Sequence, residues 1–266
     1  MDFLRTYTYG PFQSRRLGLS LGVNILPRYK LCTFNCVYCE IGSTDQLVSP
    51  EFRIKAPPSP NFRKELKDIL KFVPHLNSIN FGYNGEPSLN ENLLDFHKVA
   101  SDVREEIKWT HDIPVLTLFT NSSTLYLQEI RDRVKQFDLV LAKLDAAINE
   151  DFQRTNSPHQ QAPDIETIID SLVMLKQEMP KNHKLAIQSL IYNSYREDFI
   201  SNNNSANISK LALAIKKIKP DLVQIYSVAR IPANYFVFSI DEARKKEIIE
   251  EIQKVVNDQN VEIIYY

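Results

Sequence analysis

Cys32, Cys36 and Cys39 lie within eight residues of one another, and the 266-residue chain contains no other cysteine. Buried structural cysteines behave as small hydrophobic side chains, so packing alone predicts no such clustering. An odd number of thiols cannot all form disulfides, and disulfide frameworks are typical of short secreted chains. The spacing therefore predicts a metal site, because thiolates bind both zinc and iron–sulfur clusters.

Two kinds of metal site would use these thiolates differently. A structural zinc site needs four ligands, and the sequence has no second Cys-x2-Cys or Cys/His pair that would complete one. An iron–sulfur cluster with three cysteine ligands leaves one iron free to bind a group that is not protein. We favour the iron–sulfur cluster and keep zinc as the alternative.

A second motif, Gly85-Glu86-Pro87, follows an apolar segment at residues 76–83. A glycine loop with a glutamate at a strand end offers carbonyl and carboxylate acceptors to an ammonium group. The alternative is that Glu86 only caps a helix N-terminus, where negative charge is favourable. Beside the cysteines, we favour a ligand-binding role for Gly85 and Glu86.

Apolar and amphipathic segments alternate along the rest of the chain. The pattern predicts strands at residues 21–26, 76–83, 114–120, 138–144, 183–191, 222–227 and 261–265. It predicts helices at about residues 61–73, 90–108, 125–135, 164–179, 207–219 and 241–257. Right-handed crossovers then place the helices outside a parallel sheet.

The expected fold class is α/β, as a partial (βα)6 TIM-like barrel with parallel strands, because 266 residues are few for a full barrel with an N-terminal stretch. We expect a single domain over residues 1–266, in which residues 1–20 are an N-terminal extension that packs on the core. The polar residues 201–205 predict a solvated loop without function.

The cysteine spacing, with Tyr38 just before the last cysteine, resembles the signature of the radical SAM superfamily. The resemblance implies a radical SAM core, with one 4Fe-4S cluster on Cys32, Cys36 and Cys39 and S-adenosyl-L-methionine on the open iron. Gly85 and Glu86 resemble the Gly-Gly-Glu motif of the superfamily, although Asn84 replaces its first glycine. The resemblance implies that Tyr38, Gly85 and Glu86 bind this cofactor.

Further residues narrow the resemblance to a subgroup related to the wyosine (tRNA) synthetase. They are Gly10-Pro11, residues 14–18 and 20–23, Phe81, Thr120-Asn121, residues 144–146, and Arg230 with Pro232. The chain departs from this subgroup at Tyr83, Asn84 and Ser122, so the substrate side is expected to differ in shape. The resemblance implies reduction by a flavodoxin- or ferredoxin-type protein, a 5′-deoxyadenosyl radical, and hydrogen abstraction from an unidentified substrate.

Other side chains at the carboxyl ends of the expected strands are candidates because ligands bind there in parallel barrels. Asn121 and Asp145 are candidates for cofactor contacts, with loop capping as the alternative. Gln188, inside a strand, is a candidate for a cofactor contact in the barrel lumen, with hydrogen bonding to polar groups of the core as the alternative. Lys143 is a weak catalytic candidate as a Schiff-base amine, although a snorkelling lysine is the simpler interpretation. Arg230 is a weak candidate for an anion contact at the rim.

The substrate remains open among RNA, a peptide and a small molecule. One alternative is RNA base modification of the wyosine type, another is a protein- or peptide-modifying or activating enzyme, and a third is a non-catalytic iron–sulfur protein. The net charge of −1 gives no global basic field to attract nucleic acid, whereas Arg15, Arg16, Arg28 and Lys30 near the cysteines favour an anionic substrate. Wyosine synthetases resemble this chain but use extra cysteines for a second cluster that helps to bind pyruvate. Since Cys32, Cys36 and Cys39 are the only cysteines here, the comparison implies one cluster and no wyosine-type condensation with pyruvate.

The sequence has no run of eighteen apolar residues, and residues 1–5 lack the apolar core of a secretory signal. We therefore expect a cytoplasmic protein with no membrane partner, in a compartment where thiols stay reduced.

Overall fold

The computed structural model describes residues 5–266, so the first four residues of the expected N-terminal extension lie outside the described residues. An eight-stranded sheet has the order β1-β2-β5-β6-β7-β8-β10-β12. Its strands are β1 Thr8–Ser14, β2 Gly18–Val23, β5 Ser78–Phe81, β6 Val115–Thr120, β7 Leu139–Lys143, β8 Lys184–Leu190, β10 Leu222–Tyr226 and β12 Glu262–Tyr265. The strands from β2 to β12 are parallel, and only β1 is antiparallel to its neighbour.

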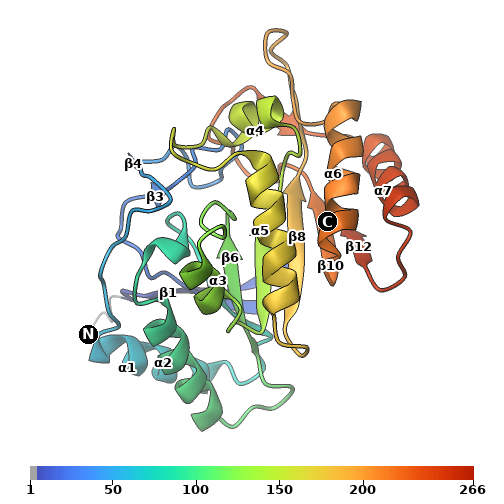
Figure 1. Ribbon diagram of the computed structural model, residues 1–266. Coiled ribbons are helices and arrows are strands. Elements are labelled where there is room, and N and C mark those ends of the chain that lie inside the picture. The colour runs from blue at the N-terminus through green and yellow to red at the C-terminus, as the bar shows by residue number, and fades with distance from the viewer. Residues whose placement is uncertain (1–4) are drawn as a thin grey trace.

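Helices connect the successive parallel strands (Figure 1). They are α1 Pro60–Phe72, α2 Leu93–Glu106, α3 Gln128–Val134, α4 Asn149–Asn156, α5 Ile165–Glu178, α6 Ser205–Ile218 and α7 Glu242–Val256. Among residues 5–266, the edge strands β1 and β12 do not pair with each other, so the sheet is not a closed barrel. The prediction of an α/β fold with a partial parallel barrel is confirmed. None of the helices in this range is long and apolar enough to cross a membrane.

The core forms where one alternating set of strand residues meets the apolar faces of the helices. On β10, for example, Val223 and Ile225 are fully buried in the main hydrophobic core. Helix α1 buries Phe62, Leu66 and Leu70, which are spaced at four residues and therefore share one face. The other set of strand residues faces away from this core and forms the concave side of the sheet. The chemistry of these side chains determines which ligands that side can bind.

The N-terminal hairpin of β1 and β2 is tied to the sheet by aromatic side chains. The Tyr9 ring lies over Gly22, where a Cβ atom would be 2.0 Å from the ring, and its hydroxyl donates to the Gly82 carbonyl at 2.5 Å. At the turn of the hairpin, the Arg16 guanidinium lies 4.4 Å from the centre of the Tyr226 ring at the end of β10. The hairpin therefore touches both β5 and β10, while the single-domain organisation of residues 1–266 stays a prediction.

Several elements were not expected from the sequence. They are β1, β3 Leu31–Cys32, β4 Gln46–Leu47, the 3-10 helix η1 Pro87–Leu89, α4, β9 Tyr192–Ser194 and β11 Val237–Ser239. The prediction that residues 201–205 form a merely solvated loop is wrong for Asn202, which is fully buried. Its amide accepts from the Tyr192 N–H at 3.0 Å and donates to the carbonyls of Asp145 and Leu190 at 2.9 and 2.7 Å. This side chain thus fixes the loops after β7 and β8.

Candidate functional site

The cysteine segment begins as β3, which backbone hydrogen bonds fasten to the loop after β5. The Leu31 N–H donates to the Asn84 carbonyl at 2.8 Å, and the Glu86 N–H donates to the Leu31 carbonyl at 3.1 Å. Gly85 permits this approach, because its φ is +130° and a Cβ atom there would lie 1.7 Å from the Leu31 carbonyl oxygen. The two motifs that the sequence singles out therefore lie side by side.

The middle of the cysteine segment is held by the end of α4. The Asn35 N–H donates to the Asn156 carbonyl at 3.0 Å, and the Val37 N–H donates to the Thr155 carbonyl at 3.0 Å. Figure 1 shows β3, β4 and α4 at the same upper end of the sheet. The segment is thus held between the loop after β5 and α4, at the carboxyl ends of the parallel strands.

The three thiols share an electrostatic environment without converging on one point. Burial raises the pKa of Cys32 to about 11 and that of Cys36 to about 12, and the neighbouring thiols, including Cys39, add to both shifts. Among residues 5–266, no three His, Cys, Asp or Glu side chains are close enough to bind a single metal ion. Ligands of different irons in one cluster need no common point, so the thiols fit a cluster better than a mononuclear zinc ion.

Glu86 is almost completely buried, 1% exposed, and accepts hydrogen bonds from three protein donors. Its Oε1 accepts from the Ser88 N–H at 3.1 Å and the Thr120 hydroxyl at 2.9 Å, and its Oε2 accepts from the Asn121 N–H at 2.6 Å. Burial raises the pKa of Glu86, although these donors act in the opposite direction. Glu86 therefore caps η1 through neutral donors, and within residues 5–266 it has no cationic partner. Its contact with the methionyl amine stays a prediction.

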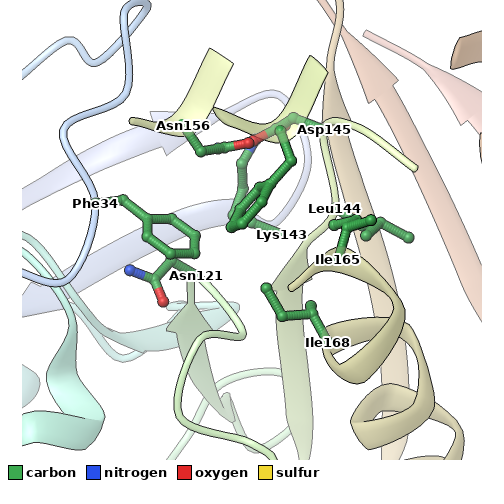
Figure 2. Close-up of a pocket in the computed structure, with 9 residues that line it drawn as sticks. Phe34, Asn121, Lys143, Leu144, Asp145, Asn156, Ile165 and Ile168 are labelled. Atoms are coloured by element: carbon green, nitrogen blue, oxygen red, sulfur yellow. The ribbon is translucent and has the colours of Figure 1, made fainter. Parts of the chain in front are cut away.

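Asp145 joins four parts of the site through its carboxylate. Its Oδ1 accepts from the Leu190 N–H at 2.8 Å and lies 2.7 Å from the Lys143 Nζ. Its Oδ2 accepts from the Asn156 Nδ2 at 3.0 Å and from the Tyr38 hydroxyl. Figure 2 shows Asp145 and Asn156 facing each other next to Lys143. The carboxylate therefore fixes β7, β8, α4 and the cysteine segment relative to one another, and its contact with the cofactor stays a prediction.

Asn121 follows β6 and reaches the first cysteine. Its Nδ2 donates to the Thr33 hydroxyl at 2.8 Å and to the Cys32 Sγ at 3.4 Å. Its Oδ1 accepts from the Ser123 N–H at 3.0 Å. The Asn121 amide thus hydrogen-bonds to the cysteine segment through its Nδ2 and to its own loop through its Oδ1. A further contact with the cofactor stays a prediction.

A cavity of about 10 Å³ lies among these side chains (Figure 2). It is lined by Phe34, Asn121, Lys143, Leu144, Asp145, Phe152, Asn156, Ile165 and Ile168. This volume corresponds to about one water molecule at most, so the cavity is a packing feature of the network and no ligand site.

The side of the sheet that faces away from the main core carries polar side chains on successive strands. They are Ser20, Ser78, Asn80, Thr117, Lys143, Gln188, Gln224 and Tyr226, whose sequence neighbours on each strand belong to the main core. Gln188 donates to the Gln224 Oε1 at 2.6 Å, and the Lys143 Nζ donates to the Tyr226 hydroxyl at 2.8 Å. The interior of a packed barrel is filled with branched apolar residues, so this face is suited to a polar ligand.

The two weak catalytic candidates both have charged partners. Burial lowers the pKa of Lys143, but the Coulombic effects of Asp145 and Tyr226 and the hydrogen bonds to both together outweigh burial, so the pKa is raised and the side chain stays an ammonium ion. Arg230 is exposed at the rim, where its guanidinium lies 3.0 Å from the Glu40 carboxylate, one residue after Cys39. Neither side chain is a free nucleophile.

Sequence reasoning missed Asn156, which contacts both Cys36 and Asp145. It also missed Thr33, which accepts from Asn121 and exchanges a hydrogen bond with Ser123 at 2.7 Å. Thr33 lies inside the cysteine motif at a position that the spacing leaves variable, and Asn156 stands in no motif, so no signal in a single sequence points to either contact.

No protein-family model matches the chain. The chain is 30% identical over 226 residues to a protein named GTPase Obg from Brachyspira hyodysenteriae, which covers 85% of this chain and 30% of that protein. It is 28% identical over 266 residues to a UPF0026 protein from Methanocaldococcus jannaschii, covering 95% of this chain and 72% of that protein. The chain thus spans less than a third of the first relative.

Solved structures share the fold at low sequence identity. Streptococcus suis SuiB bound to S-adenosylmethionine superposes with a TM-score of 0.61 and 12% identity, covering 92% of this chain and 50% of that chain. The structure of anSMEcpe with bound AdoMet and a peptide superposes with a TM-score of 0.61 and 15% identity, covering 91% of this chain and 62% of that chain. TYW1 with a lysine-pyruvate adduct superposes with a TM-score of 0.52 and 14% identity, covering 88% of this chain and 73% of that chain.

SuiB, anSMEcpe and TYW1 are radical SAM enzymes. The chain also matches them in its mainly parallel eight-stranded sheet. The chain therefore has the radical SAM fold, as the resemblance in its sequence implied.

Proposed function

We propose that this protein is a radical SAM enzyme, in which Cys32, Cys36 and Cys39 hold one 4Fe-4S cluster and the open iron binds S-adenosyl-L-methionine. The observation that carries the proposal is the position of the cysteine segment. The cysteine segment lies at the carboxyl ends of the parallel strands of the radical SAM fold, with Leu31, next to Cys32, hydrogen-bonded to the Gly85-Glu86 loop and Cys36 contacted by Asn156 at the end of α4.

The bound cluster and cofactor supply reductive cleavage to a 5′-deoxyadenosyl radical, with the electron coming from a flavodoxin- or ferredoxin-type protein. The residues of this chain bind and orient. Glu86, whose protein partners are neutral donors, would accept the methionyl ammonium, and Asp145 holds Tyr38 beside the last cysteine. The substrate lies on the polar concave face of the sheet, where hydrogen is abstracted.

The concave face favours a substrate with hydrogen-bonding or anionic groups. The Arg16 guanidinium lies against Tyr226, and its Nη1 is buried without a hydrogen-bond partner in the described part of the chain. The Gln224 Nε2 is likewise buried and unpartnered there. Unpartnered buried donors cost about 1 to 3 kcal/mol each, and acceptors on a substrate would remove this cost. This holds for an RNA base, a peptide or a small anion alike, and these substrates remain candidates.

A lysine-pyruvate adduct of the kind bound in TYW1 is disfavoured for Lys143. Such an adduct needs a neutral amine, whereas the Lys143 ammonium is held by Asp145 and Tyr226. We also expect one cluster of about four irons, because no cysteine is left for a second one. Both arguments favour hydrogen abstraction from another substrate over wyosine-type condensation with pyruvate.

Anaerobic reconstitution tests the proposal against a zinc protein and a non-catalytic iron–sulfur protein. We expect about four irons per chain, visible cluster absorbance and 5′-deoxyadenosine formation after reduction with dithionite. Cys36→Ala should lose both the iron and the cleavage, whereas His75→Ala, an exposed position outside the site, should keep both. Tight binding of one zinc would overturn the proposal, and a cluster that never cleaves the cofactor would leave only the non-catalytic alternative.

A further inference from the structure

Two asparagine side chains point their amide groups at two of the three cysteine sulfurs. The Asn121 Nδ2 lies 3.4 Å from the Cys32 Sγ, and the Asn156 Nδ2 lies 3.4 Å from the Cys36 Sγ. The two amides come from different elements, the loop after β6 and the end of α4. In the described part of the chain, Cys39 receives no such side-chain bond. The donors are therefore distributed unequally over the three thiols.

The surroundings of each amide determine that its NH2 group, and not its oxygen, faces the sulfur. The Asn121 Oδ1 accepts from the Ser123 N–H at 3.0 Å, which leaves the Nδ2 for Cys32. The Asn156 amide lies 3.0 Å from the Asp145 Oδ2, and an ionised carboxylate only accepts hydrogen bonds. Each NH2 group has two hydrogens, one for its oxygen partner and one for sulfur. Both amides are thus oriented as donors to the cysteines.

Donors of this kind matter when the sulfur becomes more negative. The reduction potential of an iron–sulfur cluster depends on its net charge, its solvent exposure and the hydrogen bonds to its sulfurs. Reduction by a one-electron donor adds negative charge to the cluster and its thiolates. An N–H group aimed at a thiolate stabilises the reduced state more than the oxidised state.

We propose that Asn121 and Asn156 are positioning residues that raise the reduction potential of the cluster through N–H···S bonds to Cys32 and Cys36. The inference rests on the proposed function, since it requires a cluster on the three cysteines. It assigns Asp145 an indirect part, because its carboxylate holds the Asn156 amide in place. The bonds would thereby make the cluster accessible to a flavodoxin- or ferredoxin-type reductant.

The test is a redox titration of the reconstituted protein without S-adenosylmethionine, followed by the EPR signal of the reduced cluster. Asn121→Ala and Asn156→Ala should each shift the reduction equilibrium about tenfold toward the oxidised cluster, which is about 59 mV for a one-electron couple. The double variant should show the sum, because the two bonds end on different sulfurs. Asn121 is partly exposed, so its variant tests the inference even if Asn156→Ala folds poorly.

The matched control is Asn80→Ala. Asn80 is a buried amide on β5 that accepts from the Ser78 hydroxyl and makes no bond to a cysteine sulfur. Its variant should keep the wild-type potential. A normally assembled cluster with an unchanged potential in both asparagine variants overturns this inference alone. A wild-type protein that binds no cluster overturns the proposed function as well.

Discussion

The two buried carboxylates of the site differ in their charged partners. The Asp145 carboxylate lies 2.7 Å from the Lys143 ammonium group, whereas the donors to Glu86 are neutral N–H and hydroxyl groups of Ser88, Thr120 and Asn121. Within residues 5–266, Asp145 is thus already paired with a cation and Glu86 is not. At the scale of single residues, Glu86 is therefore the better partner for a ligand ammonium group.

The first prediction follows from this difference. Glu86→Gln should weaken the affinity for S-adenosylmethionine about tenfold or more, because a charge-assisted hydrogen bond contributes roughly 1.5 to 3 kcal/mol. The cluster should still assemble, since Glu86 is not one of its ligands. Calorimetric titration of reconstituted protein measures the affinity. Glu40→Gln, an exposed carboxylate beside Cys39, serves as the control. Equal affinities in both variants would leave Glu86 with only its capping role at η1.

Residue chemistry alone made part of the site predictable. Cysteines and the Gly-Glu pair stand in short motifs whose chemistry does not depend on the fold. Asn156 contacts a cysteine 120 positions away, and asparagine is common in turns and caps throughout the chain. Its role depends on long-range packing, which a single sequence does not display.

At the scale of elements, the strand β3 depends on one glycine. Gly85→Ala would place a Cβ atom 1.7 Å from the Leu31 carbonyl oxygen, so β3 must move away from the loop after β5. We expect this variant to lose most of its cluster and to be destabilised by more than about 2 kcal/mol. Iron content after reconstitution and urea denaturation measure the two effects.

Gly42→Ala separates crowding from backbone strain. Gly42 also has a positive φ, +87°, but a Cβ atom there meets nothing within 4 Å. Its variant should show only the cost of the left-handed conformation, about 1 to 2 kcal/mol, and should keep the cluster. Equal loss of iron in both variants would mean that the contact between Gly85 and Leu31 is not what positions the cysteines.

Helix α2 gives a pH-dependent prediction. Its His97 packs edge-on against Phe137, with ring centres 4.7 Å apart, and burial lowers the pKa of His97 below its usual 6.5. Asp138 opposes this shift, while Arg104 and His183 reinforce it. The unfolded chain therefore binds a proton that the folded chain does not, so stability falls as pH drops through 6.5 toward the folded pKa.

Urea denaturation at pH 7.5 and 5.5 checks this prediction. The wild type should lose more stability between these values than His97→Gln, by at most about 1.4 kcal/mol per pH unit. Identical losses would show that His97 titrates alike in the folded and unfolded chains.

The long elements were predictable because their periodicity extends over several turns or residues. All seven expected strands and six expected helices have counterparts in the structure. The first strand, expected at residues 21–26, is found at Gly18–Val23, because Asn24 leaves the sheet and bonds to its own loop through Leu26. Elements of two or three residues, such as β3 and β9, arise from pairing partners far away in the chain and leave no local pattern.

At the scale of the whole molecule, the sheet separates two kinds of environment. One face packs against the helices and is apolar, and the other carries hydroxyl, amide and charged groups from β2 to β10. The alternation of apolar and polar residues along the strands was visible in the sequence. The sequence did not show that the turn of the β1–β2 hairpin would contact β10. Arg16, in the turn between β1 and β2, lies 4.4 Å from the centre of the Tyr226 ring at the end of β10. This contact makes the arginine part of the polar face.

The chain contains six glycines, none of them after Gly85, and this distribution has a thermal consequence. Helices α4, α6 and α7 end at Ser157, Lys219 and Asn257, which adopt left-handed conformations with φ of +40°, +53° and +43°. Glycine is the usual residue at such a position, and an L-residue there costs about 1 to 2 kcal/mol.

Lys219 is exposed and lies between α6 and β10, at the opposite end of the strands from the cysteine segment. Lys219→Gly should therefore raise the melting temperature by roughly 2 to 4 °C for each kcal/mol recovered, as measured by calorimetry, with cluster content unchanged. A lower melting temperature would mean that glycine's extra freedom in the unfolded chain outweighs the relief. The left-handed residues at the ends of these helices therefore lower the melting temperature, and replacing them with glycine should raise it without changing the cysteine site.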